Sequence, residues 1–82
     1  MTTTEIHARL EAIFQRVFDD DSLQIYPEMT AANVEDWDSM QHINLIVACE
    51  KEFKVKFAMS EIHDLANVGE LENLIARKVG AQ

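Results

Sequence analysis

Apolar residues recur at intervals of three and four through much of this chain, and that is the period of an α-helix rather than of a β-strand. Between Glu5 and Phe18 the recurring residues are Ile6, Leu10, Ile13, Phe14 and Val17. Thr2 and Glu5 have the spacing of a capping box, so the first helix is expected to begin near Thr3. The chain therefore opens with an amphipathic helix.

A second helix is predicted from Ser39 to about Phe53, because this stretch contains neither glycine nor proline. Its apolar stripe consists of Met40, Ile43, Ile46, Val47 and Phe53. Leu45, Ala48 and Cys49 widen the stripe beyond one narrow face, which is typical of a helix with neighbours on several sides. We therefore expect the second helix to be central.

The remaining segments complete an all-α fold. Lys54 to Phe57 alternates in polarity but has no partner strand, so it is expected to be an extended connector. Ser60 is predicted to cap a short helix ending near Leu65, and Asn67 with Glu70 to cap a last helix. The last helix carries Val68, Leu71, Leu74, Ile75 and Val79.

The connection from Asp19 to Trp37 is longer than most loops. Apolar side chains recur through it and are expected to pin it over the helices: Leu23, Ile25, Tyr26, Met29, Val34 and Trp37. The predicted architecture is a small four-helix bundle with three longer helices, one short helix and a long ordered loop between helices one and two. With 82 residues, positions 1–82 are expected to form a single domain.

Charge and cysteine content limit the function. Fifteen acidic residues against seven basic ones give a net charge of -8, which disfavours nucleic acid and anionic membranes as partners and favours basic protein surfaces. The lone Cys49 cannot form an internal disulfide, and no signal peptide is recognisable, so a cytoplasmic location is expected.

No metal site is predicted. A calcium loop begun at Asp19 would need glycine at Gln24 and glutamate at Thr30. The histidines and Cys49 lack metal-ligand spacing, and Cys49 falls on an apolar helix face, which is typical of an inert buried thiol.

The tripeptide Asp38-Ser39-Met40 stands where the second helix should begin. A serine there can cap backbone amides, and a phosphate esterified to it would lie beside the positive end of the helix dipole. Ser39 and His42 are also three apart on one helix, as a nucleophile and its base could be. No orienting acid or oxyanion hole accompanies them, so a surface histidine is the preferred interpretation of His42.

The chain resembles an acyl carrier protein across nearly its whole length. The residues that carry the resemblance are Trp37-Asp38-Ser39-Met40, Glu50-Lys51-Glu52-Phe53, Phe57 and Asn67-Val68. The resemblance implies that a phosphopantetheinyl transferase uses coenzyme A to attach a 4'-phosphopantetheine arm to Ser39. It implies a monomeric carrier without catalytic residues, whose arm presents acyl thioesters to loading and processing enzymes with basic docking surfaces.

The resemblance also suggests two sets of functional residues. Partner recognition is assigned to Glu35, Asp36, Asp38, Met40, Gln41, Ile43, Asn44, Val47 and Glu50. These side chains lie before or along the second helix. Met40 stands where the family usually has leucine, and the resemblance implies that it packs under the helix. A candidate acyl-chain cavity is assigned to residues that would be core in any helical bundle: Ile43, Val47, Phe53, Phe57, Met59, Ile62 and Leu65.

One departure from the family concerns charge. Carriers of fatty acid synthesis commonly have acids along the second helix, whereas Ser39 to Phe57 holds two acids and three bases here. Nine acids precede it, between Glu5 and Asp38. We therefore expect a dedicated fatty acid, polyketide or related pathway. The alternatives are an aminoacyl or peptidyl carrier, and an unmodified acidic helical adaptor.

Overall fold

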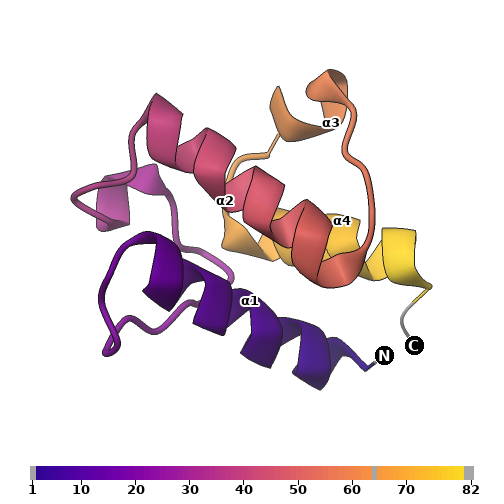
Figure 1. The fold of residues 1–82 in the computed structure, drawn as a ribbon, viewed down its shortest axis with the longest axis horizontal. Coiled ribbons are helices and arrows are strands. Elements are labelled where there is room, and N and C mark those ends of the chain that lie inside the picture. The colour runs from indigo at the N-terminus through magenta and orange to yellow at the C-terminus, as the bar shows by residue number, and fades with distance from the viewer. Residues whose placement is uncertain (1, 64, 81–82) are drawn as a thin grey trace.

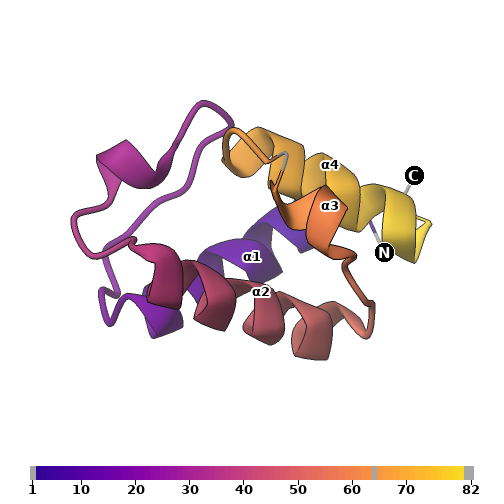
Figure 2. The same cartoon turned by 90° about the horizontal axis from the view of Figure 1, so that it is seen from above.

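Helices dominate the computed structural model, which describes residues 2–63 and 65–80. The described residues form α1 (Thr3–Val17), α2 (Ser39–Phe53), α3 (Met59–His63) and α4 (Val68–Val79), with a 3-10 turn, η1 (Ala31–Asn33), in the long loop. They contain no strand, so the predicted all-α bundle and the irregular Lys54 to Phe57 connector are confirmed for this part of the chain. Figures 1 and 2 show α1 beside both α2 and α4, with α3 set apart above them.

Helix α1, not α2, is the centre of the packing. It contacts both α2 and α4, and it buries Ile6, Leu10, Ile13 and Phe14. Helix α2 buries Leu45, Ile46, Cys49 and Phe53 against this core, while the opposite side of α2 faces solvent. The prediction of a central second helix is therefore wrong. A wide apolar stripe shows which faces are apolar, but it does not show which neighbour covers them.

Three helix starts are set by side-chain caps. Thr2 and Glu5 form the predicted capping box, and the Asn67 side chain accepts a hydrogen bond from the Glu70 N–H. At α2 the cap is Asp38, because Ser39 is already the first helical residue. Ser60 likewise lies inside α3, so the predicted Ser60 cap is wrong. The described part of α3 ends at His63, and Asp64 lies outside the described residues.

The long loop is held to the helices through both its backbone and its side chains. Ile25 and Met29 are buried, as predicted, whereas Tyr26 is exposed. The Met29 and Pro27 carbonyls accept hydrogen bonds from the first two amides of α4, at 2.8 and 2.9 Å. A Cβ on Gly69 would lie only 3.0 Å from the Pro27 carbonyl oxygen, so a larger residue there would have to push the Pro27 segment back by a few tenths of an ångström.

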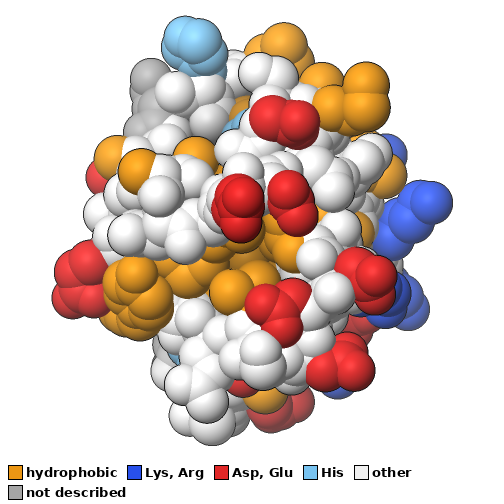
Figure 3. All heavy atoms as spheres, turned by 90° about the vertical axis from the view of Figure 1, so that its left-hand side faces the viewer, with side chains coloured by type: hydrophobic (Ala, Val, Ile, Leu, Met, Phe, Trp, Pro, Cys, Tyr) orange, Lys and Arg blue, Asp and Glu red, His pale blue; other side chains and the backbone are white. Residues whose placement is uncertain are grey.

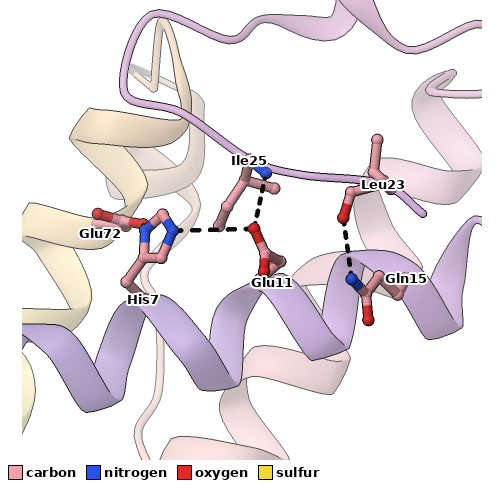
Figure 4. A network of polar contacts seen from close by, with 6 residues as sticks. All are labelled: His7, Glu11, Gln15, Leu23, Ile25 and Glu72. Carbon is pink, nitrogen blue, oxygen red and sulfur yellow. Dashed lines mark hydrogen bonds and ion pairs between the residues drawn. The ribbon is translucent and has the colours of Figure 1, made fainter. Parts of the chain in front are cut away.

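Polar side chains of α1 fasten the same loop from below (Figure 4). The Gln15 amide donates to the Leu23 carbonyl at 2.9 Å, and the Glu11 carboxylate accepts from the Ile25 N–H at 3.1 Å. His7 Nδ1 lies 2.6 Å from a Glu72 carboxylate oxygen on α4. The Gln15 and Glu11 contacts hold the loop that leads into α2, and the His7 contact joins α1 to α4.

Helix α3 is attached by few contacts. None of its residues is buried. The Lys78 ammonium on α4 lies 3.0 Å from the Glu61 carboxylate and 5.7 Å from the centre of the Phe57 ring. The Glu50 carboxylate accepts a hydrogen bond from the Phe57 N–H at 2.9 Å. Within the described residues, no helix is long and apolar enough to cross a membrane.

Candidate functional site

Ser39 is exposed at the first turn of α2. The cap beside it is Asp38, whose carboxylate accepts a hydrogen bond from the Gln41 N–H at 2.9 Å. The Ser39 hydroxyl therefore does not have the capping role that the sequence allowed it. Among the described residues, the backbone N–H groups of Ser39 and Met40 have no acceptor, so the first turn retains free donors beside the hydroxyl.

A cleft of about 810 Å³ adjoins Ser39. It lies between α2, the Phe57 connector, α3 and η1, and Ser39 is part of its lining. Six of the seven residues predicted for an acyl-chain cavity are in the lining: Ile43, Val47, Phe57, Met59, Ile62 and Leu65. Phe53 is not, because it is buried against the core. Thr30, Ala31 and Trp37 of the long loop also line the cleft, which helix periodicity gave no means of predicting.

The outer face of α2 exposes apolar side chains. Met40, Ile43 and Val47 are 73%, 62% and 41% exposed, and Met59 of α3 is 84% exposed. The predictions that Met40 packs beneath the helix, and that Ile43, Val47 and Met59 are core, are therefore wrong. The reason is that α4 packs on α1 and leaves this face of α2 uncovered. Figure 3 views the side of the molecule where the long loop meets the start of α2; it shows an apolar area among acidic side chains, with Lys and Arg along one edge.

The polar residues assigned to partner recognition divide into two groups. Glu35, Asp36, Asp38 and Asn44 are exposed. Gln41 is only half-exposed, because its side-chain amide donates to the Val17 carbonyl at 3.3 Å and so joins α2 to α1. Glu50 is likewise engaged within the chain, through the Phe57 N–H. Gln41 and Glu50 therefore also hold the fold together.

Trp37 and His42 form a pair at the start of α2. The indole N–H of Trp37 donates to Nδ1 of His42 at 3.2 Å, and the Trp37 ring meets Phe14 edge-on at a centroid distance of 5.4 Å. His42 is half-buried, which corrects the expectation of a surface histidine. Its ring is engaged by Trp37, and no hydrogen bond joins it to Ser39. The pair thus positions the start of α2 and does not form a nucleophile and base.

The Trp37–His42 hydrogen bond should make tryptophan emission depend on pH. Burial lowers the pKa of His42, so the folded protein binds the proton less readily than the unfolded chain. The neutral ring's contribution to stability is present above the ordinary histidine pKa of about 6.5 and is lost as pH falls below it. Protonation also places two N–H donors face to face, so Trp37 emission should shift to longer wavelength as pH falls below about 6.5.

Trp37 is the only tryptophan, so its emission reports this contact directly. His42→Gln should remove the pH-dependent step, and His63→Gln, at an exposed histidine, should leave it in place. An identical pH profile in the wild-type chain and His42→Gln would contradict the prediction.

Cys49 and the side chains that could bind a metal ion do not form a second reactive site among the described residues. Cys49 is buried, and desolvation raises the pKa of its thiol to about 12, as expected for an inert thiol. Residues 2–63 and 65–80 contain no group of three or more His, Cys, Asp or Glu side chains arranged to hold a metal ion.

Comparisons with known proteins agree with this geometry. A family model described as "Phosphopantetheine attachment site" matches residues 8–75. An acyl carrier protein from Picosynechococcus sp. is 31% identical over 77 residues, which is 94% of this chain and 95% of that protein. The chain belongs to the acyl carrier protein family. The solution NMR structure of a holo acyl carrier protein from Geobacter metallireducens matches with a TM-score of 0.86 and 43% identity, covering 90% of this chain and 85% of that chain.

Membership in the acyl carrier protein family confirms the resemblance seen in the sequence. The protein is a carrier and not an enzyme, and its prosthetic group is 4'-phosphopantetheine. As in its family, its partners are a phosphopantetheinyl transferase and acyl-processing enzymes. The alternative of an unmodified acidic helical adaptor is therefore excluded.

Proposed function

We propose that the Ser39 hydroxyl carries the 4'-phosphopantetheine arm and that this carrier serves a dedicated fatty acid, polyketide or related pathway in the cytoplasm. The observation that supports the attachment point is the position of Ser39. Its side chain is exposed at the first turn of a 15-residue helix, at the edge of a largely apolar cleft. Because Asp38 supplies the helix cap, the hydroxyl is free to react.

Attachment is a phosphoryl transfer. Ser39 Oγ forms a bond to the phosphorus that joins the pantetheine to the nucleotide of coenzyme A, and the bond from that phosphorus to adenosine 3',5'-bisphosphate breaks. The hydroxyl proton passes to a base on the transferase. The phosphate would then lie beside the free amides of Ser39 and Met40, where the helix dipole favours negative charge. When bound, the arm supplies a terminal thiol that holds acyl groups as thioesters.

We propose that the cleft beside Ser39 shelters the acyl chain between enzymes. Its volume of about 810 Å³ is sufficient for a small-molecule site, and its lining is largely apolar. Helix α3, which forms one wall, has no buried residue and is tied to α4 by a half-exposed ion pair between Glu61 and Lys78. Ion pairs near the surface contribute about 0–1 kcal/mol, so this pair adds little to the cost of moving α3 to admit a chain.

The dedicated pathway is supported by the charge distribution. Glu35, Asp36 and Asp38 surround the start of α2, where basic side chains of a partner would be attracted. Farther along, α2 offers Met40, Ile43 and Asn44 instead of acids. The tether raises the effective concentration of the acyl group at a partner's active site. A brief contact through these residues therefore suffices for transfer.

The proposed attachment is tested by incubating the chain with coenzyme A and a broad-specificity phosphopantetheinyl transferase. Intact mass should increase by a single phosphopantetheine group, and peptide fragmentation should place it on Ser39. Ser60, which is also exposed at the start of a helix, serves as the internal control and should remain unmodified. Addition at Ser60, or no addition with both this enzyme and the native transferase, would overturn the assignment.

A further inference from the structure

The exposed face of α2 continues beyond its apolar side chains to a lysine. Met40, Ile43, Val47 and Lys51 follow one another at intervals of three, four and four, so they share one face of the helix. All four are exposed. This face therefore begins beside acids at Ser39, is apolar in the middle and ends in a positive charge.

A second hollow lies at this basic end, between α1 and α2. It has a volume of about 380 Å³ and is lined by Arg16, Asn44, Val47, Ala48, Lys51 and Glu52. Val47 also lines the large cleft, so the two depressions adjoin at that residue. Val47 therefore links the hollow to the cleft that adjoins Ser39.

The charges in this hollow are not balanced. Glu52, its acidic member, is engaged outside the hollow by Arg9, at 3.2 Å. Within the described part of the chain, neither Arg16 nor Lys51 takes part in an ion pair. Two cations therefore flank a surface depression on a chain whose net charge is -8.

We propose that a partner enzyme places an Asp or Glu carboxylate in this hollow, between Arg16 and Lys51. The inference builds on the proposed carrier function. A guanidinium can bind a carboxylate through two N–H groups, and the neighbouring ammonium adds attraction to the same anion. At an exposed site such a charge pair chiefly increases the selectivity and the rate of association, rather than the affinity.

The partner's docking face would then have three regions of different chemistry. That face is basic where it meets Glu35, Asp36 and Asp38, and apolar opposite the middle of α2. It is acidic about 18 Å farther along, since twelve residues at about 1.5 Å each separate Ser39 from Lys51. An enzyme with a uniformly basic docking face would be repelled by Lys51 and Arg16. Such an enzyme would therefore bind carriers with an acidic second helix in preference to this one.

The test uses the holo protein and, as a probe, a malonyl transferase of general fatty acid synthesis with a basic docking face. Lys51→Glu and Arg16→Glu should each raise kcat/KM for malonyl loading by about fivefold at low salt. The control is Lys56→Glu, which makes the same charge change on the exposed connector outside the hollow. It should change kcat/KM by less than about twofold.

A charge swap tests the acidic partner group directly. Lys and Arg residues on the docking face of the probe enzyme are replaced by Glu, one at a time. The unchanged enzyme should load Lys51→Glu faster than the wild-type chain. At least one of its Glu variants should instead load the wild-type chain faster than Lys51→Glu. Equal gains in all three charge variants, or no replacement that reverses the preference, would overturn the inference. Intact mass before each assay shows whether the arm is present, so failed attachment is distinguished from a failed docking model.

Discussion

Ser39→Ala is expected to abolish phosphopantetheine attachment while leaving the fold intact. The substitution removes the only oxygen nucleophile of the side chain, so transfer from coenzyme A should fall below detection. Stability should change by about 0.5 kcal/mol or less, because the α2 cap belongs to Asp38 and Ser39 is exposed. Intact mass measures attachment, and urea denaturation measures stability.

Asp38→Ala is the complementary variant, since it removes the cap and keeps the hydroxyl. It should cost about 1 kcal/mol of stability and still accept one arm when the transferase is in excess. Ser39→Ala protein that acquires one arm would show that another residue is the attachment point. A large loss of stability in Ser39→Ala would show instead that the hydroxyl supports the helix.

Helix boundaries were predictable because they depend on local chemistry. The Thr2 and Glu5 capping box fixes the start of α1, and the lack of glycine or proline between Ser39 and Phe53 allows one continuous helix. Asp38 and Ser39 are both competent caps, so the sequence alone could not choose between them. The structure settles this by placing Ser39 one residue inside the helix.

The packing partner of α2 was not predictable from periodicity. Ile43 and Ile46 both belong to an apolar stripe, yet one is exposed and the other is buried. The difference arises because α4 lies against α1, and that choice depends on long-range contacts such as those from Pro27 and Met29 to the start of α4. The exposed apolar face, which the sequence assigned to the core, is a consequence of this choice.

Parts of the candidate site were missed for a related reason. The Trp37–His42 pair joins a loop residue to a helix residue, and the Glu50 carboxylate reaches the Phe57 amide across the end of α2. Neither contact follows a helical interval. The attachment serine was found because its neighbours in sequence carry the family's pattern, whereas the cleft depends on how α2, α3 and the loop are placed together.

Phe14→Ala is expected to destabilise the protein by about 3–5 kcal/mol. Phe14 has no exposed area and lies on α1, the helix that contacts both α2 and α4. Its ring also contacts Phe18 at a centroid distance of 5.8 Å and the edge of Trp37 at 5.4 Å. For a domain of this size, total stability is on the order of 4–12 kcal/mol, so one truncation removes a large share of it.

The matched control is Tyr26→Ala, which removes an aromatic side chain that is 42% exposed and should cost less than about 1 kcal/mol. Urea midpoints with a common slope give both values, and Trp37 emission in Phe14→Ala should shift to longer wavelength before the main transition. If the two variants lost the same free energy of unfolding, α1 would not be the packing centre. An emission shift confined to Phe14→Ala would show that the α1 core positions the loop bearing Trp37, and with it the approach to Ser39.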